Sequence, residues 1–390
     1  MEVRKMKFIL AVVVCLWVRK GITKTKIPPL IFYMLVGILL GPFGLNVFEG
    51  GVLAQSNTLR KLALAIILLR AGTSLEISSL KAMQAESILL SFVPALFEAF
   101  AITLSMLLLT EFSLIESLML AFIISAVSPA VVIPAMIKLK DKNLGTNKNI
   151  PDIILGAASL DDIFVMTIFT IILNIYSGQS SSIAKTLLHV PLTVMGGIVI
   201  GSLLAFCLKH LRHFLKIPKL FILLSAFLLL WLETNLPISS YLAIIAFGLG
   251  INHFRVIESL ELKNYLNTIW AVGEIVLFML LGASINLESL HLIRFSSLFL
   301  IIFGLVFRMI GVTLSLLGSH LNRKEKVFIM IANTPKATVQ AALAGIPLSY
   351  GVAKGEHILA LASFSIVLTA PLAAYFIDHS SQKLLSSESI

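Results

Sequence analysis

The chain has 390 residues, of which 58% are hydrophobic and 13% are charged, and its formal net charge is +10. A soluble domain carries about 25% charged residues, so this composition excludes a water-soluble protein and indicates one that lies in lipid. The basic excess does not indicate a nucleic-acid partner, because lysines and arginines in a membrane protein gather in the loops on one side and report topology.

Long apolar runs follow one another from the N-terminus to about residue 378 and leave no room for a soluble domain. About 20 apolar residues cross the roughly 30 Å of hydrocarbon in a bilayer. We therefore predict an all-α polytopic membrane protein with thirteen spans. They are residues 8–22, 28–42, 57–73, 85–110, 115–139, 150–175, 184–209, 219–233, 236–252, 267–283, 294–318, 325–347 and 356–378.

The first apolar run, residues 8–18, follows three basic residues and in this respect resembles a signal peptide. Arg19 and Lys20 stand where a signal peptide would have small residues at its cleavage site. We therefore expect this run to be the first membrane helix.

Basic residues are distributed unequally between the two ends of the predicted spans. Nineteen of the 30 lysines and arginines fall on the side opposite the N-terminus and eight fall on the N-terminal side. Since cytoplasmic loops carry the basic excess, and the number of spans is odd, we expect the N-terminus outside and the C-terminus in the cytoplasm of a multi-pass cell-membrane protein.

The two halves of the chain contain similar segments. Gly72–Leu80 aligns with Gly282–Leu290 at an offset of 210 residues, and the proline interruption at Pro129 is echoed at Pro335. Spans one to six would then repeat as spans eight to thirteen, and the connecting seventh span makes the second copy inverted. The alternative is chance similarity between apolar segments.

Five of the charged residues inside the predicted spans share one depth: Asp161 and Asp162 in the sixth span, Glu98 in the fourth, Arg308 in the eleventh and Lys336 in the twelfth. At about 1.5 Å of rise per residue, all lie roughly 16 Å from the cytoplasmic edge, to within about one helical turn. Such residues are costly in hydrocarbon and usually line a pathway. The proline breaks are tolerated at this depth where they line a cavity.

Each of these residues also has a purely structural interpretation. The aspartates could cap a half-helix, and a structural ion pair that joins the two repeats is the favoured interpretation of Glu98 and Arg308. Lys336 could balance charge at the site or hold the broken helix, and the sequence leaves these two roles open.

Four features together resemble the cation:proton antiporter superfamily, closest to its NHA branch of sodium/proton antiporters. They are Leu160-Asp161-Asp162, the crossover Val127–Val132, Glu98 and the run Pro335–Ala342. The resemblance implies inverted repeats with two broken crossing helices, a core transport domain, a panel domain that forms a homodimer, and elevator-like alternating access. Arg308 resembles the arginine of electroneutral relatives, where electrogenic ones have lysine.

The resemblance also implies a division of the chain into domains. We expect two parts of the panel domain (1–83, and 177–293 with a linker helix), two halves of the core domain (84–176 and 294–380), and a cytoplasmic tail at 381–390.

A buried carboxylate can exchange a proton for a hard cation that prefers oxygen ligands. We therefore expect Asp162 to carry Na⁺ or H⁺, Asp161 to be its coupled partner, and Ser128 to supply a further oxygen ligand. The expected substrates are Na⁺, Li⁺ and H⁺, without a cofactor. A sodium-coupled organic-anion symporter of similar architecture is the alternative. An aspartyl protease is disfavoured, because its carboxylates must lie on two facing helices.

Overall fold

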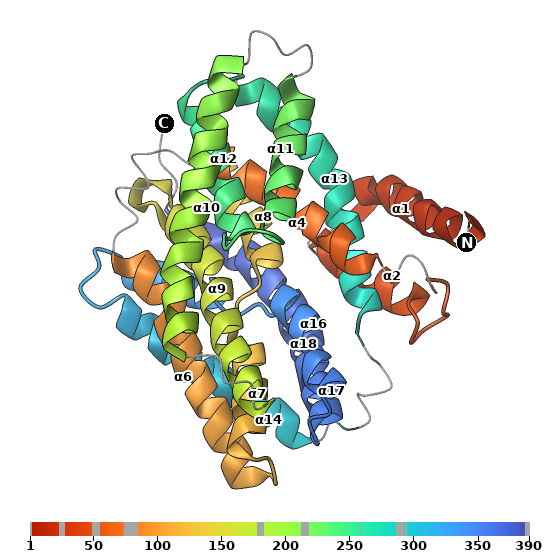
Figure 1. The fold of residues 1–390 in the computed structure, drawn as a ribbon, viewed down its shortest axis with the longest axis vertical. Coiled ribbons are helices and arrows are strands. Elements are labelled where there is room, and N and C mark those ends of the chain that lie inside the picture. Colours follow the sequence, from red (N-terminus) through yellow and green to blue (C-terminus); the bar gives the residue numbers. More distant parts are fainter. Residues whose placement is uncertain are drawn as a thin grey trace. The chain divides into compact units, whose positions relative to one another are not determined.

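The computed structural model describes residues 2–22, 28–48, 55–73, 85–177, 183–211, 218–257, 259–285, 292 and 295–386. In this part of the chain all regular secondary structure is helical (Figure 1). Most of the repeat segments Gly72–Leu80 and Gly282–Leu290, and residues 387–390 of the predicted tail, lie outside the described residues.

The chain divides into two compact units, each built from both halves of the sequence. Unit 1 contains residues 1–82 and 187–283, and unit 2 contains residues 83–186 and 284–390. The sequence placed the corresponding boundaries after residues 83, 176 and 293, so the first differs by one residue and the others by about ten.

Unit 1 consists of seven helices among its described residues. They are α1 (Glu2–Ile22), α2 (Pro29–Leu40), α4 (Ser56–Thr73), α10 (Ile183–Leu211, which enters this unit at Leu187), α11 (Pro218–Leu232), α12 (Ser240–His253) and α13 (Ser259–Ala283). Prolines open α2 and α11, where the missing N–H would have no helical partner.

Three pairs of helices in unit 1 touch through their backbones at glycines, α2 with α13, α4 with α12 and α10 with α12. A methyl group on Gly37 of α2 would lie 2.0 Å from the Met279 carbonyl oxygen of α13, and one on Gly282 would lie 2.1 Å from Met34 O. The α4–α12 pair repeats this arrangement at Gly72, where a methyl group would lie 2.3 Å from Ile245 O. Only glycine permits so close an approach.

Unit 2 combines two runs of helices that are far apart in sequence and coloured orange to yellow and cyan to blue in Figure 1. The first run is α6 (Ala85–Leu109), α7 (Leu114–Ser125), α8 (Pro129–Asp141), the 3₁₀ turn η1 (Thr146–Lys148) and α9 (Ile150–Tyr176). The second is α14 (Phe295–Ser315), α15 (Arg323–Ala332), α16 (Thr338–Leu343), α17 (Ile346–Ser349) and α18 (Gly355–Leu384).

Helices α6 and α14 pack closely and so bring the two runs together. A methyl group on Gly311 of α14 would lie 2.7 Å from the Pro94 Cα of α6. Around this contact, α6, α7, α9, α14 and α18 bury a continuous apolar core that includes Ile102 and Phe169.

Seven helices in the described ranges are long and apolar enough to cross a membrane, and four shorter apolar helices accompany them. The chain is therefore an all-helical, multi-span membrane protein. Helix α13 begins eight residues before the predicted span at 267–283, and α18 continues to Leu384, inside the predicted tail. Both extensions contain polar residues, so a prediction from apolar runs ends the span before the helix ends.

Candidate functional site

Two helices of unit 2 are interrupted, and their interruptions meet. The first break, residues 126–128, separates α7 from α8, and the second break, residues 333–337, separates α15 from α16. The Ser128 N–H donates to the Pro335 carbonyl at 2.8 Å, and the Ser128 and Thr338 hydroxyls lie 3.4 Å apart. The predicted prolines Pro129 and Pro335 thus lie at the two breaks.

Side chains from other helices satisfy the backbone of the first break. The Val127 N–H donates to Asp161 Oδ2 at 2.6 Å, and Arg308 Nη1 donates to the Ser125 carbonyl. Gln340 Nε2 donates to the carbonyls of Ile123 and Ala126, each at 2.9 Å. Because unpaired backbone groups are costly away from water, these contacts allow a helix to open inside the bundle.

The second break is held by a different set of partners. Arg308 Nε donates to the Asn333 carbonyl at 2.5 Å, and the Lys336 N–H donates to Thr369 Oγ1 at 3.0 Å. Arg308 therefore contacts both breaks.

Glu98 receives two cations on one carboxylate oxygen. Its Oε2 lies 2.7 Å from Arg308 Nη1 and 2.6 Å from Lys336 Nζ, and all three side chains are at most 1% exposed. Within the described residues, Glu98 is the ion-pair partner of Lys336 and neither aspartate is within salt-bridge distance of its ammonium. Sequence reasoning had placed Lys336 only at the level of the aspartates.

Asp161 and Asp162 are adjacent on α9, and both are buried. Asp161 has fixed partners: its Oδ2 accepts from Val127 N–H, and its Oδ1 lies 3.5 Å from Arg308 Nη2. Asp162, in contrast, has no ion pair with any residue that the structure describes, and its Oδ1 has no hydrogen-bond partner there. The two carboxylates are therefore chemically distinct.

Sequence reasoning missed two residues that support the breaks, Gln340 and Thr369. Gln340 belongs to the run Pro335–Ala342 but received no role, and its polar side chain within an apolar span was the available signal. Thr369 gave no such signal, because a hydroxyl in a helix often bonds to its own backbone, as Thr369 Oγ1 also does with Ser365 O.

The described residues contain no group of three or more His, Cys, Asp or Glu side chains that could hold a metal ion. A transported cation at this site would instead use the aspartates with hydroxyl and carbonyl oxygens near the breaks. Such oxygens are the ligands that hard cations prefer.

The chain matches the family described as "Sodium/hydrogen exchanger, transmembrane" over residues 9–378. It is 30% identical over 387 residues to the human protein named sodium/hydrogen exchanger 9B2, covering 93% of this chain and 71% of the relative. The *Xenopus tropicalis* protein of the same name is 32% identical over 349 residues. That alignment covers 85% of this chain and 64% of the relative, so the chain spans less than two thirds of that protein's length.

Two solved structures of the sodium proton antiporter MjNhaP1 from *Methanocaldococcus jannaschii* share the fold. One, at pH 8, superposes with a TM-score of 0.76 at 23% identity, covering 98% of this chain and 99% of that chain. The other has a TM-score of 0.79 at 20% identity, covering 100% and 99%. The family match and the human relative confirm the predicted resemblance to sodium/proton antiporters, and the two solved structures show the same fold.

Proposed function

Because the chain belongs to the sodium/hydrogen exchanger family, we propose that it exchanges Na⁺ for H⁺ at Asp161 and Asp162 in unit 2. Members of this family are membrane transporters and not enzymes. The observation that carries the proposal is the contrast within the pair. Asp161 is held by Val127 and Arg308, whereas Asp162 is buried with no cation partner among the described residues. Asp162 is the group free to bind a cation or a proton.

The charges of the site favour competition between one Na⁺ and one H⁺ for the same binding site. With every group ionised, Glu98, Asp161 and Asp162 supply three negative charges, and Arg308 and Lys336 supply two positive charges. One negative charge remains, and either one Na⁺ or one H⁺ neutralises it. A buried net charge is costly, so the site exchanges one cation for the other and is rarely empty.

The oxygen ligands for the cation come from α9 and from the first break. Asp162 supplies a carboxylate, and Ser128 supplies the hydroxyl that lies 3.4 Å from Thr338 Oγ1. Li⁺ binds the same hard oxygen set and is a second substrate. Lys336 balances charge through Glu98, and the Glu98–Arg308 ion pair joins the two repeats.

We further propose thirteen spans arranged as inverted six-helix repeats. Two contacts at the site join residues that are 210 positions apart, Glu98 with Arg308 and Ser128 with Thr338. A residue can touch its own repeat equivalent only near the axis that relates the repeats, so the site lies on a pseudo-two-fold axis. Gly72 and Gly282, also 210 apart, both press against a carbonyl of a neighbouring helix.

The division into two units supports elevator-like alternating access. All of the site residues lie in unit 2, which we propose is the moving core domain, while unit 1 is the panel domain of a homodimer. Basic loops orient the protein with its N-terminus outside and its C-terminus in the cytoplasm.

Proteoliposomes test the exchange directly. Internal pH is followed after addition of Na⁺, Li⁺ or K⁺, with and without an imposed membrane potential. Asp162→Asn keeps the shape of the side chain and removes its charge, and it should abolish sodium-driven proton flux. Asp378→Asn, at an exposed carboxylate paired with Lys138, is the matched control. Full flux in a correctly inserted Asp162→Asn variant would refute the assignment.

A further inference from the structure

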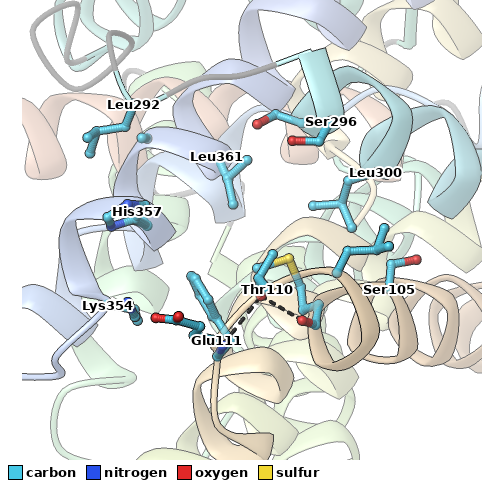
Figure 2. Close-up of a pocket in the computed structure, with 14 residues that line it drawn as sticks. Ser105, Thr110, Glu111, Leu292, Ser296, Leu300, Lys354, His357 and Leu361 are labelled. Carbon is cyan, nitrogen blue, oxygen red and sulfur yellow. Dashed lines mark hydrogen bonds between the residues drawn. The ribbon is translucent and has the colours of Figure 1, made fainter.

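A cavity of about 520 Å³ lies inside unit 2 and contains none of the exchange-site residues. It is formed by the last turn of α6 and the loop after it, the first turns of α14 with Leu292 before them, and the first turns of α18 (Figure 2). Its volume is in the range of cavities that bind small molecules, about 300 to 1,000 Å³.

The cavity combines opposite charges with hydroxyl groups. Figure 2 shows the Glu111 carboxylate on the side where Lys354 and His357 lie, with Ser296 across the cavity. Among the described residues, Glu111, Lys354 and His357 form no ion pair with one another or with other side chains. One acid and two basic groups are therefore available to a ligand.

The rest of the cavity and its rim are apolar. Leu300 and Leu361 line its wall. Leu109, which lines the cavity, is 62% exposed, and Leu108 and Phe295, each next in sequence to a lining residue, are 73% and 87% exposed. Exposed apolar side chains of a membrane protein face lipid, so we infer that the cavity opens where headgroups and acyl chains meet.

Hydrogen bonds fix the walls of the cavity in advance. Thr110 Oγ1 donates to Met106 O at 2.6 Å, which closes the end of α6. Glu116, in the capping box of α7, accepts the Lys354 N–H at 3.1 Å and so ties α18 to α7. Because the side chains that line the cavity are already ordered, little of the binding free energy is lost in ordering them when a ligand binds.

We propose that this cavity binds the headgroup of a phospholipid with a primary ammonium group, of the phosphatidylethanolamine type. The ammonium contacts Glu111, the phosphodiester contacts Lys354 and His357, and the acyl chains leave over the apolar rim. Glu111 disfavours an anionic headgroup by repulsion. A choline headgroup has no N–H to donate to the carboxylate, so it loses the charge-assisted hydrogen bond.

The purified full-length protein in detergent is titrated with dioleoylphosphatidylethanolamine, dioleoylphosphatidylcholine and soluble glycerophosphoethanolamine. Bound lipid is measured by native mass spectrometry and the melting temperature is recorded. The ethanolamine lipid should bind about tenfold more tightly than the choline lipid, the size expected for one charge-assisted hydrogen bond. Equal binding of the two lipids would overturn the proposal. Equally tight binding of the soluble headgroup would overturn the assignment to lipid.

Two variants separate the contacts. Glu111→Gln should remove the preference for ethanolamine over choline, whereas Lys354→Gln should weaken both lipids alike, because both carry the phosphodiester. Glu356→Gln, an exposed carboxylate in the same turn of α18 that does not line the cavity, should bind as the wild type does. A preference that persists in Glu111→Gln would show that the carboxylate does not recognise the ammonium.

Discussion

The two breaks of unit 2 open a helix in the same way but are held by different chemistry. Carbonyls of the first break accept from Arg308 and Gln340, and its Val127 N–H donates to a carboxylate of the exchange site. The second break uses a neutral hydroxyl, Thr369, besides Arg308. The backbone of the first break is therefore held in part by Asp161 of the exchange pair, whereas the backbone of the second break has a neutral partner and joins the ionic cluster through the Lys336 side chain on Glu98.

The largest expected effect is at Arg308, because this side chain holds both breaks and the carboxylate of Glu98. Arg308→Gln leaves a buried carboxylate with one cation fewer and should lower the free energy of unfolding by about 3 to 5 kcal/mol. Thermal unfolding in detergent measures this loss. Arg323→Gln, at an exposed arginine, should change the stability by less than about 0.5 kcal/mol.

A double-mutant cycle with Glu98→Gln isolates the ion pair. The double variant removes both charges and should recover part of the loss of the single variants, although Lys336 then lacks its partner. Strictly additive losses would show that the two side chains do not interact energetically.

A smaller loss of stability is expected for a variant that affects the first break alone. Gln340→Leu keeps the volume of the side chain but removes the donor from the carbonyls of Ile123 and Ala126, which should cost about 2 to 3 kcal/mol. Gln382→Leu, at an exposed position in α18, is the control. Equal melting temperatures for the two variants would mean that the carbonyls of the first break do not depend on Gln340.

The smallest effect is expected at the second break. Thr369→Val removes the acceptor of the Lys336 N–H and should cost about 1 kcal/mol. Thr170→Val removes only a bond from a hydroxyl to its own helix backbone and is the matched control. If Thr369→Val were more destabilising than Gln340→Leu, the contrast between the two breaks would be wrong.

The sequence was sufficient for the helical membrane fold, because apolar runs and prolines act locally and their meaning does not depend on distant partners. The charged residues inside spans identified Glu98, Arg308 and Lys336 before any geometry was known, because their burial cost makes them conspicuous. Their pairing could not be predicted in full. The cationic side chains that contact Glu98 are determined by how α6, α14 and the second break pack against one another. The spacing of apolar residues in the sequence does not predict that packing.

The difference between Asp161 and Asp162 also could not be predicted from the sequence. Two identical side chains in adjacent positions differ only in what faces them, here the Val127 N–H and Arg308. The assignment of Asp162 as the carrier rested on its depth and on the chemistry of a buried carboxylate, and the structure adds the contrast with Asp161 that supports the proposal.

The glycine contacts of unit 1 have a mechanical consequence. Packed helices usually slide past one another by small amounts, because the side chains between them can change rotamer. At Gly37 and Gly282, between α2 and α13, and at Gly72, between α4 and α12, a carbonyl oxygen lies 2.0 to 2.3 Å from where a methyl group would be, so no side chain separates the helices at these points. Each pair of helices should therefore move as one rigid unit. A displacement of one helix should then move its partner with it. Conformational changes in unit 1 should therefore take place at other helix contacts.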